Sequence, residues 1–462
     1  MKAISRIAVA MMLAGALQPG AARADELATL RSELNGLKSE YASRIAALEA
    51  RIAQLEAQAA TSPAPAPSPS PAPAPAASAG GAGTAFNPAM SVILAGTYAH
   101  LSEDPATYRI VVFVPSGPEV GPGDRSFNLG ESELTLAANV DPYFYANLTA
   151  SVLADDSITV EEAYFRTTAL THGFTVKGGR FFSSIGYLND VHAHAWDFVD
   201  QPLAYQAFLG SQLAEDGVQA KWLAPTDVFV EIGVETGNGD RFPGTRRTGN
   251  GPNGGAAFVH VGDDLGDSAS WRAGVSWLDR QAEGRTYPDA NASGQPVVNA
   301  FSGSSRTWIV DATLKWAPHG DPTQHLLKLQ AEYLRRTEDG TLAYDTTGAQ
   351  LGGDFRSVQS GWYVQGVYGF RPRWRTGLRY DYLDAVSTRI GLVSGGQLPA
   401  TAFPILAAAS PRRVTWMLDW SPSEFSRLRA QYAWDDARAT VRDRQLILQY
   451  LYSIGAHGAH KY

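Results

Sequence analysis

From Phe86 to Tyr462 the chain alternates bulky apolar residues with polar or small residues at a period of two. In residues 306–317, for example, Trp308, Val310 and Trp316 fall on one face of an extended strand, and Asp311 and Lys315 fall on the other. Alternating segments of about ten residues, with aromatic residues near their ends, are typical of transmembrane β-barrels. We expect about 16 strands. They lie near 90–101, 127–140, 142–154, 157–169, 172–183, 215–224, 226–236, 256–262, 270–279, 306–317, 324–336, 360–370, 373–383, 412–421, 424–436 and 443–454.

The connections between these segments are of two kinds. Short turns, such as those at 141–142, 225–226, 371–372 and 422–423, contain proline, aspartate or serine. Long connections are expected at 183–214, 237–255, 280–305, 337–359 and 384–411. Short turns at one end and long loops at the other favour an all-β outer-membrane barrel with both chain termini at the short-turn, periplasmic end. The alternative is a soluble β-sandwich or lectin-like domain, which would expose an aromatic face to water.

Three segments precede the barrel. Residues 1–24 combine the basic residues Lys2 and Arg6, an apolar run from Ile7 to Leu17, and Ala22-Arg23-Ala24. These features predict a secretory signal peptide, whose apolar run is too short to cross a bilayer as a helix.

Residues 25–60 predict a periplasmic helix with a coiled-coil seam. Its apolar residues recur at spacings of three and four. They are Leu27, Leu30, Leu34, Leu37, Tyr41, Ile45, Leu48, Ile52 and Leu55. The alternative is a helix packed against its own barrel, and the seam does not distinguish two strands from three. Residues 61–85 form a Pro/Ala/Gly linker in which alternate prolines from Pro63 to Pro75 enforce an extended spacer.

Composition narrows the functional classes. The 462 residues carry a formal net charge of −8 and contain no cysteine. This balance argues against nucleic-acid binding, and the absence of cysteine excludes disulfides, thiol catalysis and cysteine-ligated metals. The sequence has no Gly-rich phosphate loop that follows a strand, and it has no G-x-S-x-G motif. We therefore expect no enzyme activity and no cofactor.

Strand alternation assigns charged residues to the inside of the barrel. Six arginines on neighbouring strands would form an anion-attracting side of the lumen, namely Arg373, Arg375, Arg379, Arg413, Arg427 and Arg429. Five glutamates on earlier strands would form an acidic side across from it, namely Glu131, Glu133, Glu162, Glu231 and Glu235. The expected result is a transverse field with modest net selectivity. For any single residue, a solvated lumen position without a selectivity role explains the pattern as well.

The connection at 183–214 is the expected constriction loop. Residues such as Trp196, Phe198 and Leu203 make it too apolar to stand in water, so we expect it inside the barrel. Its candidate site residues are Asp190, His192, His194, Trp196, Asp197 and Asp200. The H-x-H pair with nearby carboxylates suits zinc, but hydrogen bonding or packing explains it equally well, so no metal site is assigned.

Four stretches carry a resemblance to a known family. They are GRFFSSIG at 179–186, NDVHAHAWDFVDQPL at 189–203, VHVGDDLGDS at 259–268 and WRAG at 271–274. Together they resemble the phosphate-selective porin (porin O and P) family and related Gram-negative outer-membrane porins with an N-terminal coiled coil. The resemblance covers most of residues 86–462. It implies a 16-stranded trimeric porin with a loop folded into the channel.

The sequence therefore predicts a passive outer-membrane porin. It would form a homotrimer in contact with outer-membrane lipid and admit small hydrophilic solutes, with a mild preference for anions such as phosphate. One alternative is an envelope-tethering protein whose barrel is only an anchor. Another is a zinc-related uptake channel.

Overall fold

The computed structural model describes residues 88–455 except 118, 154–156, 246–249 and 439. The predicted signal peptide (1–24), coiled coil (25–60) and linker (61–85) lie outside the described residues. The strands are β1 (Ala89–Leu101), β2 (Ser126–Leu129), β3 (Ser132–Asn139), β4 (Phe144–Val152), β5 (Ile158–Thr167), β6 (Phe174–Phe182), β7 (Ala214–Leu223), β8 (Phe229–Gly237), β9 (Gly254–Leu265), β10 (Ala269–Ala290), β11 (Pro296–Trp316), β12 (Leu326–Tyr344), β13 (Leu351–Arg371), β14 (Trp374–Ile390), β15 (Arg412–Ser423), β16 (Ser426–Asp435) and β17 (Asp443–Gly455).

Helical segments are short. They are α2 (Leu203–Leu209), α3 (Gly391–Ser394) and 3-10 turns at Pro105–Thr107, Ala193–Ala195, Pro318–Gly320, Ala400–Ala402 and Pro404–Leu406. No helix in the described part of the chain is both long enough and apolar enough to span a bilayer.

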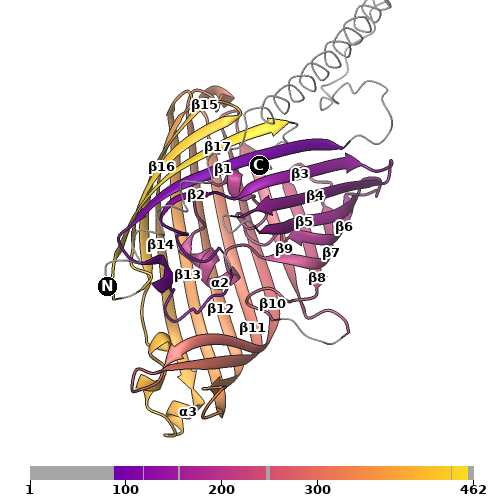
Figure 1. Cartoon of the computed structure of the whole chain (residues 1–462). Helices are drawn as coiled ribbons and strands as arrows, with labels where there is room; N and C mark the ends of the chain where they lie inside the picture. The colour runs from indigo at the N-terminus through magenta and orange to yellow at the C-terminus, as the bar shows by residue number, and fades with distance from the viewer. Residues whose placement is uncertain (1–87, 118, 154–156, 246–249, 439, 456–462) are drawn as a thin grey trace, which may run out of the picture. The chain divides into compact units, whose positions relative to one another are not determined.

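The strands form one closed antiparallel barrel (Figure 1). From β3 onward each strand pairs with the next strand in sequence, and β1 closes the barrel by pairing with β17 from Ser91↔Gly455 to Leu101↔Gln445. On its other edge β1 pairs with both β2 and β3, which are therefore two parts of one interrupted strand. The 17 segments thus make a 16-stranded barrel, and the prediction of an antiparallel barrel of about 16 strands is confirmed.

The alternating faces of the strands lie as the pattern predicted. On β11 the outward-facing residues Trp308 and Val310 are 54% and 48% exposed, whereas the inward-facing Asp311 is 1% exposed. Trp308 and Trp316 bracket an apolar stretch on the outer face. From Trp308 to Trp316 the strand extends by about 26 Å, and this length is at the lower end of the roughly 9–11 residues that a tilted transmembrane strand uses. This outer surface is suited to lipid.

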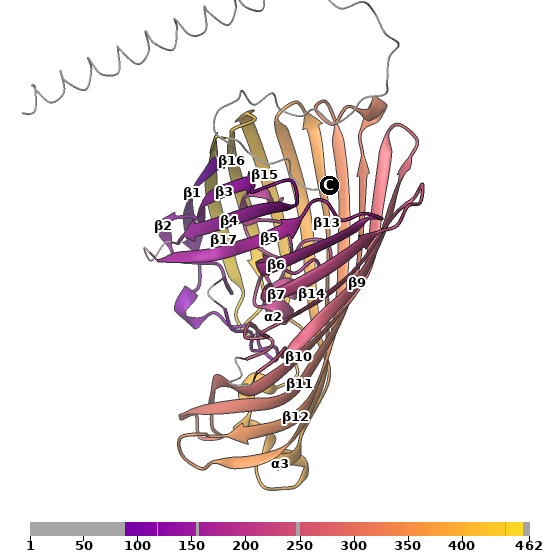
Figure 2. The ribbon, with the colours of Figure 1, turned by 90° about the vertical axis from the view of Figure 1, so that its right-hand side faces the viewer.

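Beyond that apolar stretch, β10 to β13 continue as long hairpins, which Figures 1 and 2 show at the bottom of each view. Pairing of β10 with β11 continues to Ala290↔Pro296, and pairing of β12 with β13 continues to Tyr344↔Leu351. The prediction of long loops at 280–305 and 337–359 is therefore wrong.

The physical reason is a reversal of the hydrophobic pattern along these strands. In the extension the outward residues Asp279 and Arg306 form an ion pair, while the inward residues Phe301, Leu342 and Phe355 are buried in an apolar cluster. An extension that stands in water buries its apolar face inside, so a search for outward-facing apolar residues does not detect it.

Ala312 faces outward about halfway between Trp308 and Trp316, so Ala312→Arg places a charge at the middle of the apolar stretch. We expect the free energy of unfolding in lipid to fall by about 2–4 kcal/mol. Ser304→Arg, on the same face of β11 but in the extension, is the control and should change it little. Denaturant titration of the barrel in lipid vesicles measures both. Equal effects would contradict the placement of the lipid-facing surface.

Candidate functional site

The connection between β6 and β7, residues 183–213, enters the barrel, and we call it the inserted loop. Both views show α2, which belongs to it, within the outline of the barrel (Figures 1 and 2). The Asn189 side-chain amide donates to the main-chain oxygens of Ser183 at 2.7 Å and Leu213 at 2.9 Å, which ties the two ends of the loop together. Helix α2 is buried along its whole length. The prediction that this segment packs inside the barrel is confirmed by its burial.

The wall of the barrel helps to shape α2. The main-chain N–H of Leu203, the first residue of the helix, donates to Asp381 Oδ1 of β14 at 2.9 Å. A wall carboxylate thus replaces the side-chain cap that Pro202 cannot supply. At the other end, Gly210 adopts the left-handed conformation (φ 69°) that commonly ends a helix.

Six cationic side chains project from β12 and β14–β16 toward the inserted loop, and we call them the basic wall. They are Lys328, Arg375, Arg379, Arg413, Arg427 and Arg429. Asp200 of the loop accepts from Arg379 Nη2 at 2.9 Å, from Arg413 Nη1 at 2.5 Å and from the Gln431 amide at 2.9 Å. Burial acts to raise the pKa of Asp200, but Arg413 and Arg379 more than offset it, so the pKa lies below its ordinary value. The carboxylate is therefore ionised and held by two guanidinium groups.

Asp197 makes a second set of contacts with the same wall. Its carboxylate accepts from Lys328 Nζ at 2.9 Å and from Arg375 Nη1 at 3.3 Å. Burial again acts to raise the pKa of Asp197, and the two cations lower it well below its ordinary value. Arg429 Nη2 donates to the main-chain oxygen of Trp196 at 2.9 Å, so the wall also binds the backbone of the loop.

Strand carboxylates share these cations. Arg375 pairs with Asp419 at 2.6 Å, Arg379 with Asp381 at 3.1 Å, and Arg413 Nη1 lies 3.8 Å from Asp435. Together with Asp197 and Asp200 they set five carboxylates among the six cations of the basic wall. Five of the six predicted arginines are therefore brought together by the fold, but most of the charge of the basic wall is neutralised.

On the other side of the lumen the loop meets glutamates, and we call Glu133, Glu161 and Glu162 the acidic wall. His192 Nδ1 lies 3.1 Å from Glu161 Oε2 and 3.4 Å from Glu133 Oε2, and its Nε2 lies 3.1 Å from Glu162 Oε2. His194 Nδ1 lies 2.7 Å from Glu133 Oε1. Burial acts to lower the pKa of His192, yet its hydrogen bonds to the three glutamates raise it well above its ordinary value. One loop thus presents aspartates to cations and histidines to carboxylates.

A β-bulge explains why two consecutive glutamates share this wall. The ladder between β4 and β5 runs from Thr149↔Glu162 to Ala150↔Val160, which leaves Glu161 without an opposite residue. Glu161 and Glu162 are 9% and 8% exposed. Strict alternation assigns them to opposite faces, so the sequence reading identified only Glu162, whereas the bulge turns both side chains inward.

Three other predicted site residues make different contacts. Arg373 is exposed in the turn before β14 and donates to the Pro422 oxygen at 2.8 Å. Glu231 pairs with Lys221 at 2.9 Å, and Glu235 accepts from the hydroxyl of Ser183 at 2.5 Å.

Sequence reasoning missed several members of the site. Those missed are Lys328, Asp381, Asp419, Asp435, Glu161 and the connection 102–125. That connection also enters the barrel, where Ile110, Val112 and Phe113 pack against the inserted loop. Its apolar Ile110–Val114 run was the available signal.

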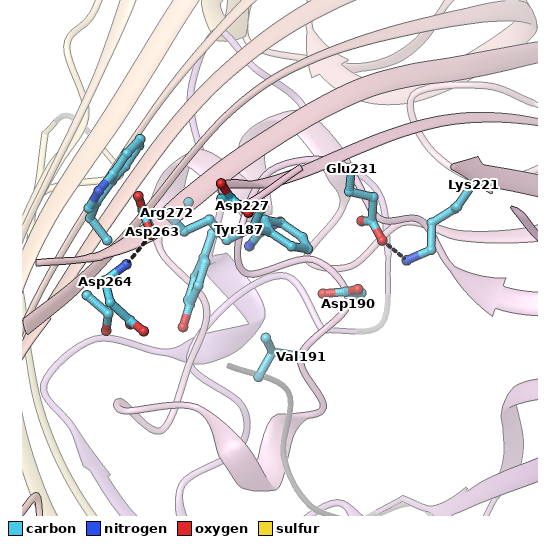
Figure 3. Close-up of a pocket in the computed structure, with 13 residues that line it drawn as sticks. Tyr187, Asp190, Val191, Lys221, Asp227, Glu231, Asp263, Asp264 and Arg272 are labelled. Atoms are coloured by element: carbon cyan, nitrogen blue, oxygen red, sulfur yellow. Dashed lines mark hydrogen bonds and ion pairs between the residues drawn. The ribbon is translucent and has the colours of Figure 1, made fainter. Parts of the chain in front are cut away.

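Two cavities flank the inserted loop. A cavity of about 520 Å³ lies between the loop and β7–β10 toward the short-turn end, where Tyr187 and Asp190 of the loop face wall residues (Figure 3). Its charged lining comprises five acids and two bases, namely Asp190, Asp227, Glu231, Asp263, Asp264, Lys221 and Arg272. A second cavity, of about 510 Å³, lies between the loop and connection 102–125. Its charged lining consists of Asp104, Glu119, Asp124, Glu131 and Asp200, and no Lys or Arg is among the described residues that line it.

No family model matches the chain. An uncharacterized protein of Aquifex aeolicus is 34% identical over 362 residues, which are 73% of this chain and 70% of that protein. The loop L8 deletion mutant of OmpT, an outer membrane protein of Vibrio cholerae, aligns with a TM-score of 0.50 and 12% identity over 80% of this chain and 100% of that one. In vitro folded OmpT in its trimer form aligns with a TM-score of 0.48, 12% identity, and 80% and 99% coverage. The likeness to the OmpT loop deletion mutant shows that the chain has an outer-membrane porin-like fold.

Asp200→Asn removes the charge that binds two buried arginines, so we expect unfolding to become easier by about 3 kcal/mol and the inserted loop to be cut faster by protease. Asp436→Asn is the matched control, because Asp436 also binds two arginines, Arg412 and Arg442, but at an exposed site. Its expected effect is below about 1 kcal/mol. Denaturant titration and limited proteolysis measure both variants. Similar results for the two would contradict the role given to Asp200.

Proposed function

We propose that this chain, which belongs to the same family as the uncharacterized Aquifex aeolicus protein, is an outer-membrane channel for passive diffusion of small hydrophilic solutes. The observation that carries the proposal is the position of the inserted loop inside a closed barrel, with a cavity on each side of it. A loop held between two charged walls narrows a lumen without requiring the strands to move. Solutes would pass the loop while keeping most of their hydration.

The arrangement of the ends supports an orientation. We propose that the short turns and both termini face the periplasm, and that the long hairpins of β10–β13 and the connection 391–411 face outward. The predicted coiled coil at 25–60 would then lie in the periplasm and hold three copies together, with outer-membrane lipid against the apolar outer face. Permeation needs no covalent chemistry, so we propose neither an enzyme activity nor a cofactor.

The charges around the cavities change the expected sign of the selectivity. A mild preference for anions was expected from the six arginines predicted on one side of the lumen. Five carboxylates engage the basic wall, however, and the first cavity carries five acids against two bases. Counter-ions accumulate in a cleft lined by charges of one sign. We therefore propose a weak preference for cations.

In planar bilayers under a KCl gradient, the purified protein should give a reversal potential of the sign for cation preference. Asp263→Asn combined with Asp264→Asn removes two cavity carboxylates and should move the reversal potential toward zero, with a larger effect at low salt.

Asp267→Asn is the control for that experiment, because Asp267 lies in the turn that follows the end of β9, close in sequence to Asp263 and Asp264, but outside the cavity lining. A reversal potential of the opposite sign would contradict the cation preference and restore the expected anion preference. A protein that inserts and conducts no ions would contradict the channel itself and favour the tethering alternative.

A further inference from the structure

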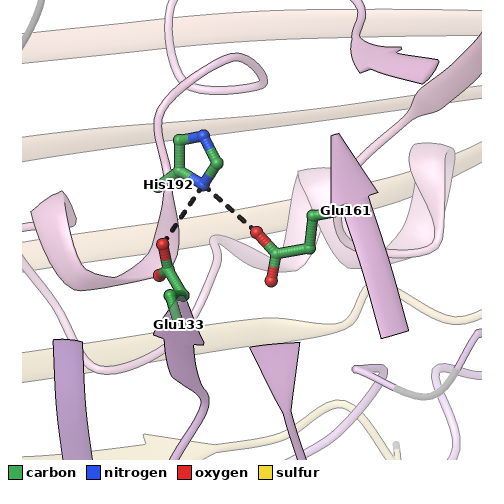
Figure 4. A group of neighbouring side chains, drawn as sticks. All are labelled: Glu133, Glu161 and His192. Atoms are coloured by element: carbon green, nitrogen blue, oxygen red, sulfur yellow. Dashed lines mark hydrogen bonds and ion pairs between the residues drawn. The ribbon is translucent and has the colours of Figure 1, made fainter. Parts of the chain in front are cut away.

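The contact between the inserted loop and the acidic wall has the composition of a metal site. Glu133 comes from β3, Glu161 from the bulge of β5 and His192 from the loop, so three separate segments converge. Their ligand atoms all lie within 4.8 Å of one another. Figure 4 shows both carboxylates pointing at the same ring nitrogen of His192. The three residues therefore do not lie together merely because they are neighbours on one strand.

The distances suit a small tetrahedral ion. An ion that binds nitrogen and oxygen at about 2.0–2.1 Å separates its ligand atoms by about 3.3–3.4 Å. His192 Nδ1 lies 3.4 Å from Glu133 Oε2 and 3.1 Å from Glu161 Oε2. One ring nitrogen carries at most one proton, which cannot point directly at both carboxylates. A cation between the three atoms would satisfy all of them.

The surrounding groups form the outer shell that metal ligands require. His192 Nε2, on the far side of the ring, lies 3.1 Å from Glu162 Oε2, which is the carboxylate–histidine–metal arrangement. Glu161 accepts a hydrogen bond from the Ser151 hydroxyl through its other oxygen, and Glu133 contacts His194 Nδ1 through its other oxygen at 2.7 Å. Each of the three ligand groups therefore has an orienting partner. This shell is an observation independent of the cluster itself.

We propose that Glu133, Glu161 and His192 bind one divalent transition-metal ion of the zinc class, which joins the inserted loop to the acidic wall. An imidazole with two carboxylates suits Zn²⁺, whereas Ca²⁺ and Mg²⁺ favour oxygen-only sets. Binding would replace the Nδ1 proton of His192, leave Nε2–H directed at Glu162, and keep a position open for water. The site is separate from the channel proposal, because binding does not require conduction.

Calorimetry on the full chain in detergent, first treated with a chelator, should detect one Zn²⁺ per chain and no comparable Ca²⁺ binding. The titration uses a background with His457→Ala and His460→Ala, because these histidines offer zinc a second place outside the described residues. Glu161→Gln and His192→Ala should each weaken Zn²⁺ binding at least tenfold, and Glu162→Gln, which alters only the outer shell, by about 10–100-fold.

His325→Ala is the control, because His325 contacts the Gly369 main-chain oxygen and the Tyr368 ring far along the chain from the cluster. It should bind zinc as the parent does. The parent also gives a test that needs no variant, since Zn²⁺ should raise its unfolding temperature and Ca²⁺ should not. The proposal is overturned if the parent binds no zinc, if Ca²⁺ binds equally well, or if Glu161→Gln binds zinc with parental affinity.

Discussion

The inserted loop is held from two sides by charges of opposite sign, and the interior of the barrel depends on this arrangement. Burying a charged wall under a loop costs solvation free energy unless each charge finds a partner. Asp197 and Asp200 supply partners for the basic wall, while His192 and His194 supply partners for the acidic wall. Helix α2 then fills the space between with apolar side chains, and Asp381 of the wall caps it. The loop and the walls therefore determine each other's conformation.

The strand pattern was sufficient to predict the barrel, because an apolar outer face and a polar inner face impose alternation wherever a strand crosses lipid. It predicted Trp308 and Val310 outward and Asp311 inward correctly. The same rule failed for the long hairpins at 280–305 and 337–359. There water replaces lipid outside the barrel, so Phe301 and Phe355 turn inward and the sign of the pattern changes. A local pattern cannot report which solvent surrounds it.

The candidate site was predicted less completely for a related reason. Composition and burial pointed to residues 183–214, but the partner of each loop residue depends on strand register, which a single sequence does not reveal. Strict alternation placed Glu161 outside, and only the bulge opposite Thr149 and Ala150 brings it to His192. The arginines were assigned to the lumen, yet the net charge of the basic wall depends on Asp419, Asp381 and Asp435. The register of β14–β16 places these carboxylates beside the arginines. The sign of the expected selectivity changed with them.

Direct charge contacts bind the loop to the basic wall, and a double-mutant cycle between Asp200 and Arg413 tests these contacts most directly. The unfolding free energies of Asp200→Asn, Arg413→Gln and the double variant would be measured in the same detergent. Direct contact predicts strong non-additivity, with a coupling of about 1–3 kcal/mol. Additive effects within about 0.3–0.5 kcal/mol would contradict the account, because they would mean that Asp200 and Arg413 do not interact directly.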